Sequence, residues 1–324
     1  MTTHRSKKYS HKKQPHKSTG NRKAALVDYP MQLPITVEFK ERLLLFNGCE
    51  TPISLFKFER PEPARVAAFR EGVAYFSLPN GFNDTQDCRL ALDGSLSNEE
   101  LKLALSPENQ WLTAGAPPLS ANQTNQAAWI EGANAHLSIA YFRTILEEYK
   151  RGGRRRIRQR LDLLANLFAR PVQTGGICCF TDDWRNELMW EKYARKDSGF
   201  VLEFNTQNCA ICWDASPIEY VDKFPKIRLY AAAMAGTTWK DMLRVPLTKL
   251  RERWWQEREW RTWRMIPGFY RYAPDSLVSV TLGQRIQDDL ANCLLAIVAS
   301  KYFPRTRVYE TKFVDGALVR IPIM

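Results

Sequence analysis

Two glutamates near residue 258 are the residues of this chain best suited to chemistry. Glu257 and Glu259 are separated by one residue, so in an extended strand both side chains would point to the same face, about 7 Å apart. Two carboxylates at this spacing can contact one substrate together. The alternative is structural, because nearby arginines could pair with both glutamates. These arginines are Arg253, Arg258 and Arg261.

Other common catalytic sets lack a necessary part. Outside the first 25 residues the only histidine is His136, which excludes Ser-His and Cys-His triads and HExxH zinc sites. The chain has neither the P-loop motif nor the GxGxxG fingerprint of dinucleotide-binding folds. Cys209 and Cys212 form one CxxC without a second pair, so we interpret them as a reduced structural pair and predict no metal site. Carboxylate chemistry remains.

Three blocks of the sequence together carry a family resemblance. The central block spans residues 189–204. It contains Met189-Trp190 and, after two residues, Tyr193-Ala194, and then an apolar stretch that begins at Gly199-Phe200 and ends at Glu203-Phe204. An earlier block spans 55–58 and 74–84, and a later one contains Lys249, Trp254, Glu257, Glu259 and Arg261. Together these blocks resemble a bacterial family known as domain of unknown function 2971. This resemblance implies a related fold more than it implies an activity.

A more distant similarity is to ADP-ribosyltransferases, which use NAD as substrate. In that family a basic residue on an early strand holds the phosphates, a strand serine braces the ribose, and a Glu-x-Glu motif supplies the glutamate at the reacting centre. The resemblance implies these roles for Lys57, Ser77 and Glu259, with Glu257 as the first glutamate of the motif. Tyr193 would form an aromatic wall for a planar ring, although aromatic residues at helical spacing usually pack in a core.

Basic residues are concentrated in two places. Residues 1–27 contain eight Lys or Arg and no acid, so the net charge of +12 is mostly that of a basic tail. Residues 151–160 contain six arginines, of which Arg154, Arg155, Arg156 and Arg158 are candidate nucleic-acid-binding residues. The alternatives are a solubilising tail and an exposed helical hairpin.

The pattern of apolar residues predicts an α+β fold, a mixed sheet with helices packed on it. We expect residues 1–27 to be disordered and residues 28–324 to form a single domain with a helical insertion at 85–170. That insertion would begin with a mobile lid at 84–125, including a short helix at 97–104. Two longer helices would follow at 126–150 and 156–168, broken at Gly152 and Gly153.

The predicted elements outside the insertion begin with strand, helix and strand at 53–58, 64–69 and 73–78. The central motif is predicted as a strand at 176–180, a helix at 184–194 capped by Thr181, Asp182 and Asp183, and a strand at 200–204. Further predicted strands lie at 210–220, 259–266 and 278–282, and helices at 230–253 and 283–300. A hairpin around Asp315 and Gly316 would close the chain.

These observations lead to one principal hypothesis and two alternatives. The first is a bacterial toxin-like or antiphage effector that transfers ADP-ribose from NAD to a nucleic acid, or to a protein bound to it, and that a regulatory protein such as an antitoxin would restrain. The second is a non-catalytic nucleic-acid-binding defence module. The third is a metal-dependent phosphodiesterase that uses Asp84, Glu257 and Glu259. Since no apolar run approaches the roughly 20 residues of a membrane span, we expect a cytoplasmic protein with no membrane partner.

Overall fold

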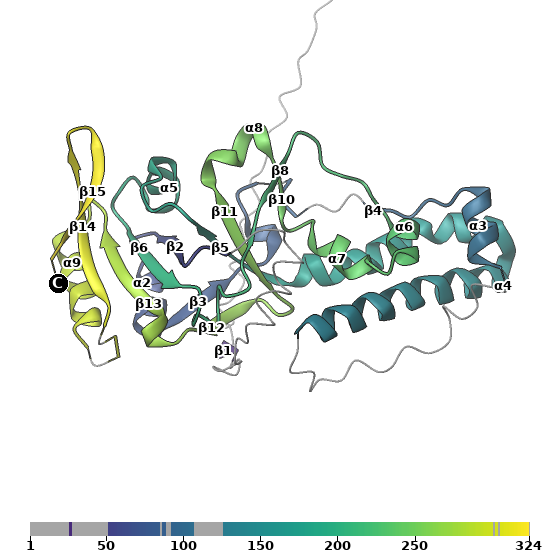
Figure 1. Cartoon of the computed structure of the whole chain (residues 1–324), viewed down its shortest axis with the longest axis horizontal. Coiled ribbons are helices and arrows are strands. Elements are labelled where there is room, and N and C mark those ends of the chain that lie inside the picture. The colour runs from purple at the N-terminus through teal and green to yellow at the C-terminus, as the bar shows by residue number, and fades with distance from the viewer. Residues whose placement is uncertain are drawn as a thin grey trace, which may run out of the picture.

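The centre of the protein is an eight-stranded mixed sheet with helices packed around it (Figure 1). The structure, a computed structural model, describes residues 26–27, 51–84, 86–88, 92–106, 126–300, 302–303 and 305–323. The strand order is β15-β14-β13-β6-β2-β5-β11-β7, and every neighbouring pair is antiparallel except β13 and β14. The predicted fold class is therefore confirmed. Residues 1–25 of the predicted tail and 107–125 of the predicted lid lie outside the described residues.

The central motif folds as strand, helix and strand, and it differs from the prediction in where the helix begins and how it is capped. Strands β5 (Gly176–Thr181) and β6 (Phe200–Asn205) form as expected, but β2 lies between them in the sheet. Helix α5 (Glu187–Tyr193) begins three residues later than predicted, because Asn186 supplies the cap by accepting a hydrogen bond from the Met189 backbone N–H. Of the acids predicted as caps, Asp182 lies 2.7 Å from Arg258, and Asp183 lies 3.7 Å from it while accepting a hydrogen bond from the Arg185 backbone N–H at 3.0 Å.

The opening unit contributes to two different sheets. Strand β2 (Ser54–Glu59) joins the central sheet, and helix α2 (Pro63–Arg70) leads to β3 (Val73–Phe76), as predicted. Strand β3 pairs with β12 (Gly268–Arg271) in a three-stranded sheet. The third strand there is β1 (Leu26–Val27), which the prediction had placed in the tail. An isolated bridge from Ser77, the residue after β3, to Ile177 of β5 links β3 to the central sheet.

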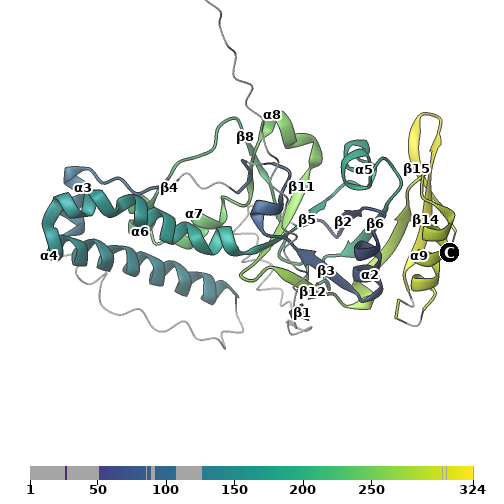
Figure 2. The same cartoon turned by 180° about the vertical axis from the view of Figure 1, so that it is seen from behind.

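A helical module extends from one side of the sheet (Figures 1 and 2). Ser97 and Glu100 form a capping box at the N-terminus of helix α3 (Asn98–Ala104). Helix α4 (Gln126–Thr174) is the predicted hairpin of two helices, which turns at Gly152 and Gly153, and Gly153 has the positive φ that suits glycine. Its apolar face packs against α6 (Leu229–Met234) and α7 (Thr238–Leu243), so the module draws on residues well beyond the predicted insertion.

The region 210–258 is where the sequence-based prediction was wrong. The predicted strand at 210–220 is two short strands, β7 (Ser216–Pro217) and β8 (Glu219–Val221). The predicted helix at 230–253 is broken into α6, α7, strand β10 (Thr248–Leu250) and α8 (Arg251–Trp254). Gly236, at a φ of +66°, ends α6, and Pro246 precedes β10. These two breakers account for the interruption.

The last part of the chain follows the prediction more closely. The strands are β11 (Glu259–Arg264), β13 (Leu277–Leu282), β14 (Arg307–Val314) and β15 (Ala317–Pro322), and helix α9 (Asp288–Val298) is shorter than predicted. Asp315 and Gly316 both have positive φ, the geometry of a tight hairpin turn. The remaining short elements are η1 (Pro79–Gly81), β4 (Leu92–Asp93), β9 (Ile227–Arg228), η3 (Trp255–Glu257) and η4 (Pro274–Ser276). Within the described residues, no helix is both long and apolar enough to cross a membrane.

Candidate functional site

The two glutamates of the Glu-x-Glu motif meet on one lysine, but not in the way that a strand would bring them together. Glu257 belongs to η3, and Arg258 then adopts a left-handed backbone with φ 47°, so only Glu259 lies on β11. Lys249 Nζ lies 3.0 Å from Glu257 Oε2 and 2.6 Å from Glu259 Oε2. All three side chains are at most 5% exposed. The two glutamates therefore do not share a strand, which begins at Glu259 as predicted, but their carboxylates do converge.

Arg261 completes this buried cluster on the same strand. Its Nε donates to Glu259 Oε1 at 2.7 Å, and its two terminal nitrogens donate to the two carboxylate oxygens of Asp87 at 2.7 and 2.5 Å. Asp87 comes from the loop after β3, 174 residues earlier in the chain. We call Asp87, Lys249, Glu257, Glu259 and Arg261 the ion cluster. Three carboxylates and two cations are thus held together out of water.

The charges within the ion cluster decide its protonation. Burial favours a neutral Glu259, but the positive charges of Arg261 and Lys249 outweigh burial and hold the pKa of Glu259 well below its usual range. Burial likewise opposes a charged Lys249, yet Glu259 and Glu257 raise its pKa above the usual range. Glu259 is therefore an anion and Lys249 a cation at neutral pH, and Glu259 is a fixed negative charge rather than a proton donor.

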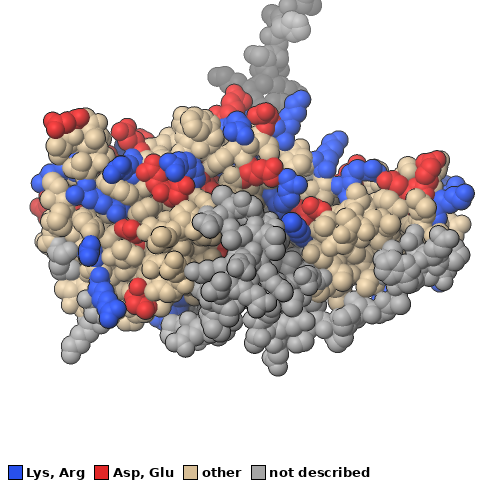
Figure 3. Space-filling view, viewed as in Figure 1, with Lys and Arg blue, Asp and Glu red and all other residues tan. Residues whose placement is uncertain are grey.

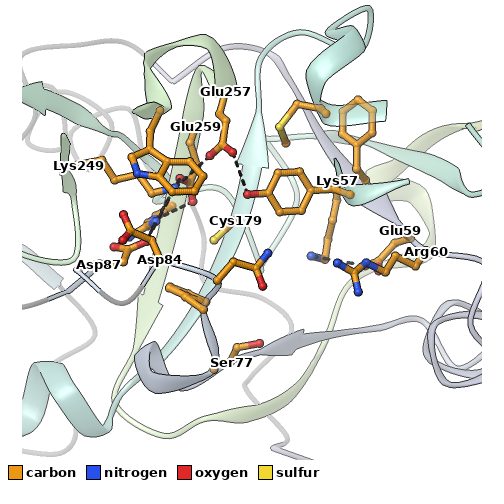
Figure 4. A pocket seen from close by; sticks show the side chains of 18 of the residues that line it. Lys57, Glu59, Arg60, Ser77, Asp84, Asp87, Cys179, Lys249, Glu257 and Glu259 are labelled. Carbon is orange, nitrogen blue, oxygen red and sulfur yellow. Dashed lines mark hydrogen bonds and ion pairs between the residues drawn. The ribbon is translucent and has the colours of Figure 1, made fainter. Parts of the chain in front are cut away.

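The ion cluster forms one wall of a cleft of about 260 Å³ (Figure 4). Strands β2 and β5 make a single register pair, Phe56 with Thr181, and the cleft lies beside this pair. Figure 4 shows two groups of labelled side chains, with Cys179 and Ser77 between them. One group is Asp84, Asp87, Lys249, Glu257 and Glu259, and the other is Lys57, Glu59 and Arg60. The charged lining residues are Lys57, Glu59, Arg60, Arg65, Asp84, Asp87, Lys249, Glu257, Glu259 and Arg261.

All five residues that the sequence singled out for NAD chemistry line this cleft. They come from segments as far apart as β2 and β11, and they are Lys57, Ser77, Tyr193, Glu257 and Glu259. The Tyr193 hydroxyl donates to Glu257 Oε1 at 2.9 Å, and burial together with the negative charge of Glu257 raises the pKa of Tyr193 above its usual value. Its hydroxyl thus stays protonated, and its ring is held at the wall of the cleft.

The cleft also contains residues that sequence reasoning had not assigned to it. Arg60, Arg65 and Asp87 were not singled out, and Lys249 and Trp254 were noted only as part of a family block. The Trp254 ring lies 4.5 Å from Lys249 Nζ and 4.8 Å from Lys192 Nζ, so two ammonium groups already contact it. Lys249 lies eight residues before Glu257, and no periodic pattern relates the two. A buried Asp87 has no sequence signal of its own.

Cys179 lies against Glu259 in the cleft. Burial and then the negative charge of Glu259 raise the pKa of the Cys179 thiol, so it stays protonated and is not an activated nucleophile. Arg261 donates two hydrogen bonds to Glu259 and Lys249 donates one, so both carboxylate oxygens already accept from a cation.

The arginines proposed for nucleic acid lie elsewhere, at the turn of α4, at the end of the module remote from the sheet (Figure 1). Arg154 and Arg155 are exposed, whereas Arg156 Nε lies 2.6 Å from Glu148 Oε2. The side chain of Arg158 lies outside the described residues. Figure 3 shows basic and acidic side chains intermixed at this end of the molecule rather than one uniform basic face.

The carboxylates of the cleft are not arranged as metal ligands. Among the residues that the structure describes, no group of three or more His, Cys, Asp or Glu side chains could hold a metal ion. Lys249 and Arg261 occupy the positions between the three carboxylates of the ion cluster. Lys249 thus lies between Glu257 and Glu259, two of the three carboxylates that the phosphodiesterase hypothesis uses.

Comparison with known protein families, with curated proteins and with solved structures gives no match. The resemblances to domain of unknown function 2971 and to ADP-ribosyltransferases therefore remain predictions from the residues quoted above.

Proposed function

We propose that the cleft binds NAD and that the protein transfers ADP-ribose from it. The observation that carries this proposal is the division of charge in the cleft. At one end, three cations line the cleft beside one carboxylate, Glu59, and at the other end four carboxylates line it beside two cations. NAD has the complementary division, with a cationic nicotinamide ring at one end and a diphosphate towards the other. Electrostatic complementarity of this kind orients a ligand.

The chemistry follows from which charges are fixed. In the proposed reaction the bond between nicotinamide and the ribose carbon breaks, and nicotinamide leaves with the electron pair. The acceptor then forms a bond to that carbon and releases a proton. Glu259, an anion held by Arg261 and Lys249, would stabilise the positive charge that develops on the ribose, since preorganised charges need no rearrangement during the reaction. Tyr193 would flank the ring, and Lys57 would hold a phosphate.

A nucleic acid, or a protein bound to one, is the acceptor that we propose. The support is the basic composition of residues 1–27 and the exposed Arg154 and Arg155 at the α4 turn. A toxin-like or defence role follows from such an activity, since modifying a cell's own nucleic acid would be harmful. The alternative is a binding module without catalysis, which these arginines favour because their phosphate contacts would need no cleft.

The test is transfer of label from adenylate-labelled NAD to RNA, single-stranded DNA and cell extract. Wild type should label one of them, and Glu259→Gln should abolish the label. Asp214→Asn is the matched control, because Asp214 also pairs with a β11 arginine, Arg264 at 2.7 and 3.1 Å, but does not line the cleft.

The control separates chemistry from stability. A loss of labelling in Glu259→Gln while Asp214→Asn stays active, with both variants folded by circular dichroism, would support the transferase. The absence of both labelling and NAD consumption in wild type would refute it, and salt-sensitive binding of nucleic acid in the same samples would support the binding module.

A further inference from the structure

The three cations at the basic end of the cleft are buried to different depths. Lys57 on β2 has a side chain only 11% exposed, Arg65 on α2 is 36% exposed, and Arg60 in the connecting loop is 44% exposed. All three line the cleft. A ligand that enters here would meet Arg60 and Arg65 near the opening and Lys57 further in.

These three cations have weaker partners than those of the ion cluster. Glu59 lies 3.5 Å from Lys57 and 3.5 Å from Arg65, and Arg60 has its carboxylate partner, Glu62, at 3.8 Å. Charge-assisted hydrogen bonds are shorter, about 2.7–2.9 Å, as in the ion cluster. The N–H groups at this end are thus able to donate to a ligand, whereas those of Lys249 and Arg261 are already occupied.

From this arrangement we infer a diphosphate subsite, in which Lys57 contacts the inner phosphate and Arg60 and Arg65 contact the outer one. The three lining cations exceed the one lining carboxylate by two charges, which matches one negative charge on each phosphate of a diphosphate diester. Guanidinium groups also suit phosphate oxygens, because they donate two parallel hydrogen bonds. The cleft therefore selects ligands with a diphosphate over nucleoside monophosphates. The inference deepens the proposed function, since NAD is joined by a diphosphate, but it can be tested without turnover.

The experiment is calorimetric titration of the full-length protein with ADP and with AMP. Wild type should bind ADP about tenfold more tightly than AMP, the scale of one hydrogen bond to a charged group. Arg60→Ala/Arg65→Ala should bring this ratio close to one, and Lys57→Met should weaken both ligands. Arg70→Ala is the matched control, because Arg70 is on the same helix but does not line this cleft.

Each outcome bears on the subsite. A ratio near one in wild type, no binding of either nucleotide, an unchanged ratio in the double variant, or an equal fall in Arg70→Ala would overturn it. NAD consumption is measured on the same proteins. If turnover does not depend on Arg60 and Arg65 and the protein does not prefer ADP, the transferase proposal is kept and the subsite is rejected. If the protein prefers ADP but does not consume NAD, the subsite is kept and the transferase proposal is rejected.

Discussion

The ion cluster and the turn of α4 both pair arginine with carboxylates, yet they hold their charges in opposite ways. Arg261 is 2% exposed and is bonded to Glu259 and to Asp87, which is remote in sequence. Arg156 is partly exposed, and its partner Glu148 lies on the same helical hairpin. The buried network uses charges that are scattered along the sequence, whereas the arginine side chains that the structure describes in the dense run are exposed or partly exposed. Charge density along a sequence therefore does not reveal where charge matters most for stability.

The difference has a physical basis. Ion pairs at a surface contribute about 0–1 kcal/mol, because water screens them and the long side chains lose entropy. A buried charge has lost its water and depends on its partners, so removing one partner leaves the others uncompensated. Changes in the ion cluster should therefore alter folding, and changes at the α4 turn should alter binding.

The largest effect is expected for Arg261→Met. Asp87 and Glu259 would both remain buried without this partner, at a cost of about 3–5 kcal/mol in the free energy of unfolding. Urea unfolding followed by circular dichroism measures it. Arg156→Ala, at the α4 turn, should cost less than ~1 kcal/mol. Equal costs for the two variants would remove the distinction between the regions.

Lys249→Met should have a smaller effect, roughly 1–3 kcal/mol, because Arg261 still neutralises Glu259 while Glu257 loses its buried cation. The same urea titration measures it. If NAD is the substrate, turnover should fall as well, because the position of Glu257 relaxes. A variant as stable as wild type would show that Lys249 does not hold the carboxylates together.

The third prediction concerns acid stability. An unfolded glutamate titrates near a pKa of about 4.3, and the pKa of native Glu259 lies well below that. The stabilisation from ionised Glu259 is thus complete above the unfolded pKa and is lost as the pH falls through the lowered native pKa. The stability difference between wild type and Glu259→Gln should therefore shrink below about pH 4, as measured by urea unfolding at several pH values. A difference that stays constant or widens there would contradict the ionised state.

The smallest effect on stability is expected at the α4 turn. Arg154→Ala/Arg155→Ala should change the free energy of unfolding by less than about 0.5 kcal/mol, since both side chains are exposed. It should weaken nucleic-acid binding and reduce the dependence of affinity on salt by about one unit per lost phosphate contact. Fluorescence anisotropy with labelled RNA and DNA measures this. Arg60→Ala/Arg65→Ala is the control, because it removes two positive charges at the cleft instead of at the α4 turn. An equal loss of nucleic-acid affinity in this control would show that the net charge of the protein, and not the α4 turn, determines binding.

Several elements were determined by local sequence and were predicted correctly. The apolar runs of β2, β5, β6 and β13, the break at Gly152 and Gly153, and the turn at Asp315 and Gly316 all follow from short-range patterns. The failure between 229 and 258 was also local, because helical periodicity was followed past Gly236 and Pro246. Nearest-neighbour propensities and periodicity are sufficient to define such elements.

Finding the cleft required both the local sequence and the tertiary structure. From the sequence alone, the scarcity of histidine outside the tail directed attention to Glu257 and Glu259, and the resemblance to ADP-ribosyltransferases implied roles for Lys57 and Ser77. Only the tertiary structure brought them to one cavity and added Asp87 and Lys249, since pairing across the sheet and the left-handed backbone at Arg258 set those contacts. A hydrogen bond between residues 174 positions apart leaves no trace in local sequence, because its energy arises only when folding removes both groups from water.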